Sequence, residues 1–589
     1  MRVAVLIQDR CKPNSNAFRY LERFAGMCGG ECIQIEDNKC RILETACPPC
    51  FYRARLCPGN AVIVINLPEE LDTDMTHCYG ENGFRLFRLP APRQQQVVGI
   101  LGPNGVGKST AINLLSGSIK PNLGDWKNAP PDWDEIISTF PRGELRDYLG
   151  LVAEEGVSIA VKPQNIDKLP KLWSGKVRGL LARVDDRGEF EECAHLVGVD
   201  HLLDRELAAL SGGELQRVAI CATILKEADV YFFDEPSSYL DIYERMRMVK
   251  IVQDLASKGK RVIVVEHDLA ILDVLCDLIH IVYGERAAYG IFTPARSTRS
   301  AINMYLDGFL PEENVRIRDK KIEFLRGRIR GEGIGLPILK WGDMEKTLGD
   351  FKLKTGEGMV RSAEVVGVVG PNATGKTTMV KMIAGEMEPD QGWCTMEAKV
   401  SYKPQHVQTD FEGTVEEWLN MELGNKWRTG EFHTQVVRPL QVDQLVDLKA
   451  KKLSGGELQA VSITICLGKE ADLYLLDEPS AHLDANARME AAKAIRRTME
   501  SNEKAAMVID HDIYFIDIVS DSLLVFDGEG GKHGNAVGPL ILRKGMNKFL
   551  EDIDMTFRRD HESYRPRINK PNSRKDREQK VAGEYFYIE

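Results

Sequence analysis

The chain has 589 residues, of which 43% are hydrophobic, and its formal net charge is −11. This length allows about three or four domains. No stretch of eighteen or more uncharged apolar residues occurs, and residues 1–10 are too short and too soon charged for a signal peptide, so the composition excludes a transporter with fused membrane spans and predicts a soluble, cytoplasmic protein. The acidic balance argues mildly against indiscriminate nucleic-acid binding.

Cysteine is concentrated at the start of the chain. Seven of the 13 cysteines lie in residues 1–70, at Cys11, Cys28, Cys32, Cys40, Cys47, Cys50 and Cys57. Because no secretory signal accompanies them, this density predicts metal binding rather than disulfide bonds.

Two phosphate-binding loops follow, one in each half of the chain. Residues 102–109 and 370–377 both fit the pattern G-x-x-x-x-G-K-[ST], and each comes between a short apolar run and an apolar-periodic stretch. In such loops backbone N–H groups face the phosphates, the lysine reaches the outer phosphates and the hydroxyl binds magnesium. We therefore predict two ATP sites. Their loop residues are Gly102, Asn104, Gly105, Gly107, Lys108, Ser109 and Thr110 in the first half, and Gly370, Asn372, Gly375, Lys376, Thr377 and Thr378 in the second.

Each half repeats a further set of polar residues. Apolar strands end at the pairs Asp234-Glu235 and Asp477-Glu478, in which the aspartate suits the magnesium shell and the glutamate can orient or deprotonate the attacking water. Another strand in each half ends at a histidine suited to the terminal phosphate, and a Lys-Pro-Gln segment supplies a glutamine. These residues are His267 and Gln164 in the first half, and His511 and Gln405 in the second. We expect Ser109, Gln164, Thr377 and Gln405 to bind magnesium.

The heptapeptide Leu-Ser-Gly-Gly-Glu-Leu-Gln occurs twice, at 210–216 and 453–459. A lone phosphate loop or carboxylate pair is moderate evidence at best, but the ordered and repeated set is specific. These residues resemble the ATP-binding cassette superfamily. The resemblance implies an α/β fold with two cassettes paired head to tail, and an ATPase in which each site joins one loop to the other half's heptapeptide. Ser454 and Gly456 would complete the first site, and Ser211 and Gly213 the second.

The first half carries an insertion. The loop lysine and the glutamine are 56 residues apart in the first half and 29 in the second, so about 27 extra residues lie within 125–158. They include the helix start signal Pro130-Pro-Asp-Trp133 and two amphipathic segments separated by Pro141-Arg-Gly143. We predict a helix-loop-helix on the first cassette only. Such an insertion either has no function of its own or, more often, contacts a partner.

Two basic segments, 316–330 and 564–580, each contain seven Lys or Arg and two acidic residues. A run of charge is usually a solvated face. Because both runs come just after a cassette ends, a phosphate-facing or inter-cassette role is the alternative.

The cysteine-rich head, the two cassettes, the insertion, the connector at 301–318 and the tail at 557–570 together resemble subfamily E of the ATP-binding cassette proteins, the ribosome-recycling ATPases also known as RNase L inhibitor. The resemblance covers essentially the whole chain. It implies an enzyme that binds post-termination ribosomes through small-subunit RNA and proteins, beside a release factor or its relative, with links to initiation factors and no membrane partner. ATP-driven closure of the cassettes would part the ribosomal subunits.

The resemblance also assigns roles to segments. It implies a Cys-rich ferredoxin-like domain at 1–70, a first cassette at 71–295, hinge 1 at 296–330, a second cassette at 331–543 and hinge 2 at 544–589. The inserted helices would touch the small subunit. An aromatic residue that stacks on adenine is expected at Tyr79, and Trp341 is the candidate in the second cassette.

One part departs from the family pattern. The family's head holds two [4Fe-4S] clusters, but read without gaps from Cys11 its first cysteine run falls on Asn16, Tyr20 and Phe24, and Arg53 replaces a cysteine of the second. Two thiolates per cluster do not normally hold a cube. The ordinary pair of clusters is therefore expected to be absent. The alternatives are a zinc site of Cys11, Cys47, Cys50 and Cys57, a metal-free domain, or one cluster restored through Cys28, Cys32 or Cys40.

Other functions stay open. A nucleotide-gated adaptor on ribosomal or initiation complexes would use hydrolysis only for release, and an F-subfamily translation factor would typically have a long charged helical linker instead of this head and tail. A DNA-organising ATPase would need a long heptad insertion, whereas only about 100 residues separate loop and heptapeptide.

Overall fold

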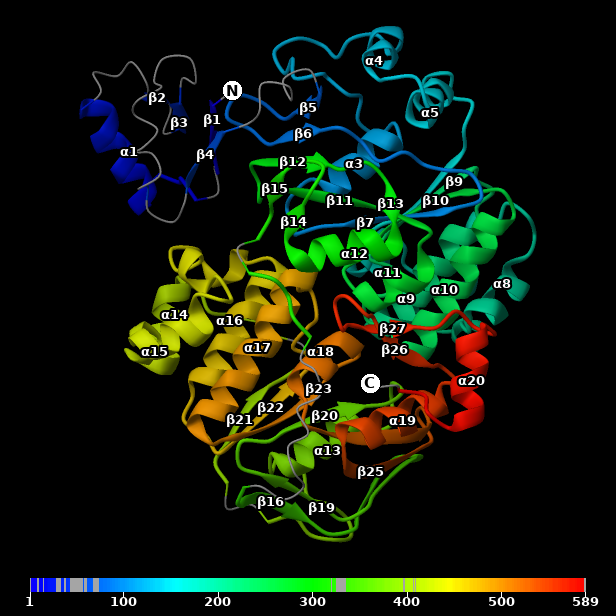
Figure 1. Cartoon of the computed structure of the whole chain (residues 1–589), viewed down its shortest axis with the longest axis vertical. Coiled ribbons are helices and arrows are strands. Elements are labelled where there is room, and N and C mark those ends of the chain that lie inside the picture. The colour runs from blue at the N-terminus through cyan, green and yellow to red at the C-terminus, as the bar shows by residue number, and fades with distance from the viewer. Residues whose placement is uncertain are drawn as a thin grey trace.

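The protein consists of two cassettes that follow one another along its longest axis, with a small N-terminal domain beside the first cassette (Figure 1). The computed structural model describes residues 2–586 apart from 8–9, 14, 28–32, 37–38, 43–56, 58–60, 67–73, 319, 325–334, 396–397, 406 and 408. No helix in the described part of the chain combines the length and apolarity that a membrane span requires.

The N-terminal domain is a small α/β unit. Strand β1 pairs with β4 and β2 with β3, both antiparallel, and helix α1 contacts β2. The bounds are β1 Arg2–Leu6, α1 Asn16–Met27, β2 Ile33–Glu36, β3 Lys39–Ile42 and β4 Val62–Asn66. Phe18, Leu21 and Phe24 recur at helical spacing on α1 and are buried together with Cys11 and Cys40, which gives the domain an apolar core of its own.

The first cassette is built on a mixed nine-stranded sheet. Five of its strands run parallel, and the three inner ones of these are almost fully buried, as expected of short apolar runs covered on both faces. The strand order is β5 (Met75–Cys78), β6 (Arg85–Phe87), β12 (Tyr289–Phe292), β11 (Leu278–Glu285), β7 (Val97–Leu101), β10 (Arg261–Val265), β9 (Val230–Asp234) and β8 (Ile159–Lys162), with β13 (Arg296–Ser297) beside β11. The α-helices are α3 (Lys108–Leu115), α4 (Trp133–Thr139), α5 (Glu144–Ala153), α6 (Leu169–Leu172), α7 (Val177–Val184), α8 (Phe190–Val197), α9 (Gly212–Ile224), α10 (Ile242–Ser257), α11 (Leu269–Leu275) and α12 (Thr298–Asp307).

The extra residues of the first half form the predicted helix-loop-helix, α4 and α5. Ile136, Tyr148 and Leu149 bury its inner face, and the Tyr148 hydroxyl donates to the Leu115 carbonyl at the end of α3 (2.7 Å). The pair is therefore held rigidly on the helix that follows the phosphate loop.

The second cassette repeats the strand order of the first, without the ninth strand. Its sheet runs β17 (Met344–Leu348), β18 (Phe351–Thr355), β25 (His533–Ile541), β24 (Ser522–Glu529), β20 (Val365–Val369), β23 (Ala505–Ile509), β22 (Leu473–Asp477) and β21 (Val400–Lys403), and β16 (Pro337–Trp341) pairs separately with β19 (Gly358–Arg361). The α-helices are α13 (Lys376–Ile383), α14 (Val415–Leu423), α15 (Gly430–Phe432), α16 (Gly455–Gly468), α17 (Ala485–Asn502), α18 (Ile513–Val519) and α19 (Leu542–Asp552).

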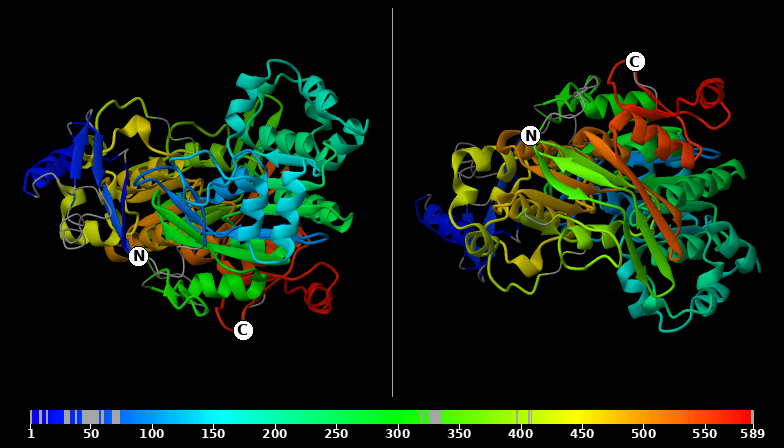
Figure 2. Two further views of the ribbon diagram at one scale, coloured as in Figure 1. Left: turned by 90° about the horizontal axis from the view of Figure 1, so that it is seen from above. Right: turned by 90° about the horizontal axis from the view of Figure 1, so that it is seen from below.

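The C-terminal elements pack against both cassettes. They are the hairpin β26 (Phe557–Arg559) and β27 (Pro566–Ile568) and the helix α20 (Arg574–Ala582), and β27 contacts α11 of the first cassette. Between the cassettes the chain forms the short pair β14 (Phe309–Leu310) and β15 (Val315–Arg316). Buried apolar residues of both cassettes and of this C-terminal part belong to one cluster. The N-terminal domain and α20 lie on opposite sides of the molecule (Figure 2).

Candidate functional site

The first phosphate loop connects β7 to α3. Gly107 has a φ of 94°, which favours glycine, and a Cβ at this position would lie 2.7 Å from the Phe84 ring. The Lys108 ammonium donates to the carbonyls of Gly102 (2.9 Å) and Pro103 (2.7 Å), and burial lowers its pKa to about 8. A buried lysine beside a helix N-terminus forms a cradle for phosphate.

The second loop, between β20 and α13, repeats this geometry. Gly375 has a φ of 97°, and a Cβ there would lie 3.0 Å from the Phe351 ring. The Lys376 ammonium donates to the carbonyls of Gly370 (2.8 Å) and Pro371 (2.6 Å), and burial again lowers its pKa to about 8. Both predicted loops therefore have the local structure that phosphate binding requires.

A hydroxyl and a carboxylate meet beside each loop. Ser109 Oγ donates to Asp234 Oδ2 and Thr377 Oγ1 to Asp477 Oδ2, each at 3.1 Å, and burial raises the pKa of both aspartates. Magnesium prefers one or two such oxygens together with substrate phosphates over an all-protein cage. Accordingly, the described residues contain no group of three or more His, Cys, Asp or Glu that could hold a metal alone. The donors present fit Mg²⁺ bound together with ATP.

Glu235 directs its carboxylate between the glutamine and the histidine of the first half. It has a φ of 47°, a strained value for a non-glycine residue, and its Oε1 accepts from Gln164 Nε2 (2.7 Å) and lies 3.4 Å from His267 Nε2. Burial raises the pKa of Glu235, but its contact with His267 and the positive charges of Lys108 and of Arg488 from the second cassette outweigh burial and lower the pKa to about 2. Both ring nitrogens of His267 are buried, and beyond the contact of Nε2 with Glu235 neither has a partner among the described residues.

Glu478 occupies the same place in the second half with a looser histidine contact. Its φ is 46°, its Oε1 accepts from Gln405 Nε2 (2.6 Å), and it lies 3.8 Å from His511 Nε2. Burial raises the pKa of Glu478 to about 7, and the neighbouring carboxylates of Asp477 and Asp510 add to the rise. Burial lowers the pKa of His511. The two equivalent glutamates thus differ in pKa because only Glu235 is paired closely with a histidine.

Four polar residues that the motifs did not single out as site residues fix these carboxylate pairs. They donate from side-chain nitrogen to the backbone carbonyls of the Asp-Glu pairs and hold the strained turn in place. The donors are Lys162, which bonds Asp234 (2.9 Å) and Glu235 (3.2 Å), Lys403, which bonds Asp477 (2.7 Å) and Glu478 (3.3 Å), Gln216, which bonds Glu235 (2.9 Å), and Gln459, which bonds Glu478 (2.6 Å). Their recurrence at equivalent places in both halves was the available signal.

Each phosphate loop meets the opposite cassette. The backbone N–H of Asn104 in the first loop donates to Asp484 Oδ2 of the second cassette (3.1 Å). The backbone N–H of Asn372 in the second loop donates to Asp241 Oδ2 of the first cassette (2.8 Å). A Cβ on Gly456 of the second heptapeptide would lie 4.0 Å from Asn104 Nδ2. The first loop is therefore closed by the second cassette, as the head-to-tail pairing predicts.

The heptapeptide serines begin helices. Ser211 and Ser454 cap α9 and α16 with a reciprocal capping box to the glutamate three residues on. Gly213 and Gly456 lie in the first turns of these helices, so each heptapeptide presents a helix N-terminus, which favours anions.

The two aromatic residues expected to stack on adenine, Tyr79 and Trp341, differ in their exposure. Tyr79 is 52% exposed, and its hydroxyl donates to Thr110 Oγ1 (3.4 Å) in the first turn of α3, so its ring stands open beside the first loop. Trp341 is 1% exposed and its indole donates to the Gly356 carbonyl (2.9 Å). The expectation that Trp341 stacks on adenine is wrong, because its ring fills the core opposite Gly358, where a Cβ would lie 2.2 Å from the ring. Thr378 lies in the first turn of α13, as Thr110 does in α3.

Comparisons with known proteins agree with this geometry. A family model described as ABC transporter matches residues 92–238 and 353–481. The chain is 42% identical to ABC transporter E family member 1 of Arabidopsis thaliana, over 100% of this chain and 99% of the relative, and 39% identical to translation initiation factor RLI1 of Saccharomyces cerevisiae, over 100% and 98%. The translational throttle protein EttA of Escherichia coli is 25% identical, over 74% of this chain and 87% of EttA.

Solved structures give the same result. A chain from the structure of ribosome-bound archaeal Pelota and ABCE1 superposes with a TM-score of 0.94 at 47% identity, covering 100% of this chain and 99% of that one. A chain from the complex of archaeal ribosomal stalk protein aP1 with the recycling factor aABCE1 has a TM-score of 0.83 at 47% identity, covering 88% and 100%. The chain therefore belongs to subfamily E of the ATP-binding cassette proteins and is an ATPase.

Proposed function

We propose that this protein splits post-termination ribosomes into their subunits and that ATP binding and hydrolysis drive the cycle in the cytoplasm. The observation that carries the proposal is the composite construction of both sites, in which Asp241 and Asp484 each bond the loop of the other cassette. ATP bound at this interface would therefore change the distance between the two cassettes. A partner that contacts both cassettes would be put under mechanical strain by that change.

The proposed catalytic cycle assigns roles to the chain's own residues. Lys108 and Lys376 neutralise phosphate charge, and Glu235 and Glu478 orient or deprotonate the attacking water. His267 and His511 donate to the terminal phosphate. Mg²⁺ would be held by Ser109 and Gln164 in the first site and by Thr377 and Gln405 in the second, and it would neutralise phosphate charge. Each glutamine now donates to the catalytic glutamate of its own site and would have to break that bond before binding the ion.

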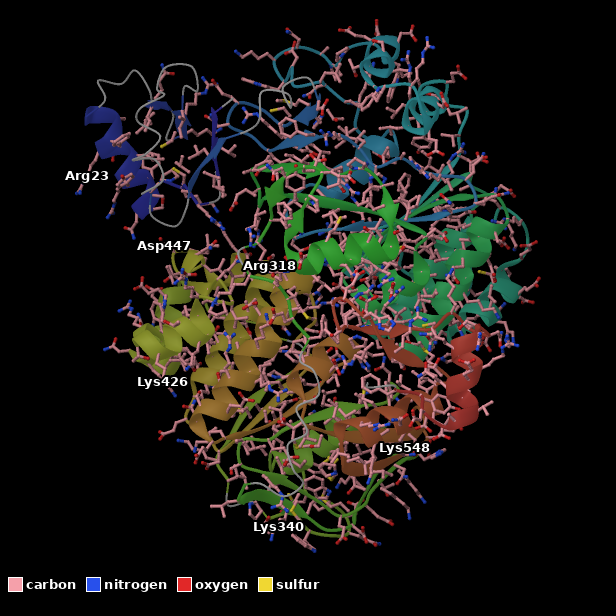
Figure 3. The ribbon with its side chains drawn as sticks, viewed as in Figure 1. Arg23, Arg318, Lys340, Lys426, Asp447 and Lys548 are labelled. Atoms are coloured by element: carbon pink, nitrogen blue, oxygen red, sulfur yellow. The ribbon has the colours of Figure 1, made fainter. Side chains whose placement is uncertain are left out.

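The basic hinge residues divide between the two roles foreseen for them. Arg565 and Arg567 bind Asp273 of the first cassette, which supports an inter-cassette role for them. Arg318 of hinge 1 likewise donates to Asn486 of the second cassette (3.0 Å), and Figure 3 shows it on the connection between the cassettes. We propose that the exposed Lys570, Lys575 and Arg577 face ribosomal RNA phosphates instead. Helices α4 and α5 are the proposed contact with the small subunit.

The partner factor follows from the relatives. The structure that superposes at 0.94 carries Pelota in its printed description, and the yeast relative is called an initiation factor. We infer that a release factor or its relative, and initiation factors, bind beside this protein on the ribosome. We propose that none of these partners is a membrane.

We infer that the N-terminal domain lacks the ordinary two [4Fe-4S] clusters. Eight thiolates are required for two such clusters, whereas residues 1–70 contain seven cysteines. Phe24, at an expected ligand position, is 6% exposed in the core and stacks on Tyr20 with ring centroids 6.3 Å apart. The core also holds Cys11, Cys40 and Cys57. Residual metal, if zinc, would use Cys11 and Cys57 with Cys47 and Cys50, and the last two lie outside the described residues.

The cysteine thiols in this core lie close enough to shift one another's pKa. A hydrogen bond to Cys40 raises the pKa of Cys11, and the same bond lowers that of Cys40, while burial raises the pKa of Cys57 to about 11. Iron and zinc analysis of anaerobically purified protein tests this part: about eight irons per chain would sink it, and one zinc or no metal supports it.

The adaptor alternative differs in what hydrolysis does. We replace Glu235 and Glu478 by Gln together and follow ribosomes and subunits with ATP. A recycling motor should bind ribosomes tightly and fail to turn over, whereas an adaptor should keep its function. The alternative of an F-subfamily-like translation factor is disfavoured, because the chain is 42% identical to an E family member over its whole length.

A further inference from the structure

Arg245 in the first turn of α10 bonds three backbone or side-chain oxygens at the cassette interface. Its Nε donates to the Leu240 carbonyl (2.8 Å), and its Nη1 donates to Asp268 Oδ2 (2.7 Å). The same Nη1 donates across the interface to the carbonyl of His511 (3.2 Å). The Arg245 side chain is 9% exposed, so these bonds form in a site that excludes most water.

The two acceptors of Arg245 Nη1, Asp268 and His511, belong to segments of different ATP sites. Asp268 directly follows His267 and caps α11, where its Oδ1 accepts from the amides of Ala270 (2.8 Å) and Ile271 (3.1 Å). His511 is the phosphate-facing histidine of the second site. One guanidinium therefore connects the segment that carries the first histidine to the segment that carries the second.

The equivalent arginine of the second cassette provides an internal comparison. Arg488 Nε donates to the Leu483 carbonyl (2.9 Å), and its Nη1 donates to Asp512 Oδ2 (2.9 Å), which matches two of the three bonds of Arg245. Among the described residues, Arg488 makes no bond to the carbonyl of His267. Arg488 reaches the first site through its charge, which helps to lower the pKa of Glu235, whereas the crossing bond to a histidine carbonyl is made, among the described residues, to the second site alone.

We propose that Arg245 is a positioning residue that acts in trans on His511, so that turnover at the second ATP site depends on a side chain of the first cassette. The bond holds the backbone of His511, and hence the height of its imidazole over the second loop. When the cassettes separate, this bond breaks together with the loop contacts, and His511 loses a support that has no counterpart at His267 among the described residues. The proposal rests on ATPase activity and is independent of ribosome splitting.

The test removes the arginine without leaving a buried charge. We combine R245M with D268N, which keeps the net charge and leaves an asparagine able to cap α11. Turnover at one site is isolated with E235Q, which leaves the second site, or E478Q, which leaves the first. The matched control is R488M with D512N, and R245K is the conservative variant. Thermal unfolding checks that each protein is folded.

We expect R245M/D268N to lower the second-site kcat about tenfold, with the KM for ATP changed less than about twofold, because positioning acts on the reaction more than on binding. First-site kcat should fall less than about threefold, R245K should recover most of the loss, and R488M/D512N should leave first-site kcat within the same margin. Equal losses at both sites, or an unchanged second site, would overturn the proposal. A parallel fall in first-site kcat for the control would show a merely structural role.

Discussion

Asp273 on α11 is the point at which hinge 2 is attached to the first cassette, and its charge can be removed without changing its shape. It is 1% exposed and accepts four hydrogen bonds: from Arg565 Nη1 (3.1 Å) and Nη2 (3.4 Å), and from Arg567 Nε (2.9 Å) and Nη2 (3.1 Å). Asp273→Asn leaves Arg565, which is fully buried, without its ion-pair partner.

The size of the effect follows from which arginine can find another partner. Breaking a buried ion pair from one side costs about 3–5 kcal/mol. Arg567 is 16% exposed and lies 3.5 Å from Asp560, so it keeps a partner and the loss should lie near the lower limit, about 3 kcal/mol. In a cassette-sized unit this lowers the first thermal transition by about 6–12 °C. ATPase activity should fall as well, because both composite sites need the cassettes held together.

The double variant D273N/R565M separates charge from packing. It removes the stranded guanidinium, so we expect it to recover about 2 kcal/mol relative to D273N. Differential scanning calorimetry of the parent and both variants measures this order. A D273N transition within about 1 °C of the parent, or a double variant less stable than the single one, would refute the reasoning.

Three further predictions concern the sites and the N-terminal domain. Replacing Asn82, whose side chain makes two hydrogen bonds to the backbone of β3 (2.9 and 3.0 Å), with Ala should loosen the N-terminal domain by about 1–3 kcal/mol, seen as faster amide exchange in β3; unchanged exchange would contradict the contact. With a pKa of about 7, Glu478 is mostly protonated at pH 6 and ionised at pH 8, so kcat/KM of the E235Q variant should rise about tenfold over this range, whereas that of E478Q should stay flat; equal profiles would contradict the assignment. Tyr79→Ala should raise the first-site KM for ATP and Trp341→Phe should not change either KM, as measured by steady-state ATPase assays; a Trp341 effect on KM would restore its adenine role.

The motif residues could be predicted from sequence because their chemistry requires fixed local spacing. A phosphate loop, a strand-end carboxylate pair and a capped heptapeptide are each defined within about ten residues. Their assembly in each half therefore needed only the order of strands in the sheet. The insertion could be found for the same reason, since comparing two copies of one pattern exposes extra residues.

The contacts that join the cassettes could not be predicted in this way. Arg245 and His511 are 266 residues apart, and Arg565 and Asp273 are 292 apart, and no local pattern marks either pair. A basic run looks the same whether it faces solvent or a buried aspartate. The face of an aromatic residue on a strand is equally undetermined: Trp341 points inward because β16 pairs with β19 and places Gly358 opposite its ring.

The central claim is that this ATPase parts ribosomal subunits, and sucrose-gradient sedimentation tests it most directly. Purified post-termination ribosomes are incubated with the protein, ATP and a termination factor or its relative, and then separated into intact ribosomes and subunits. We predict that intact ribosomes decrease and both subunits increase only in the complete reaction, and that E235Q/E478Q does not sustain repeated splitting. Unchanged intact ribosomes in the complete reaction would contradict the account.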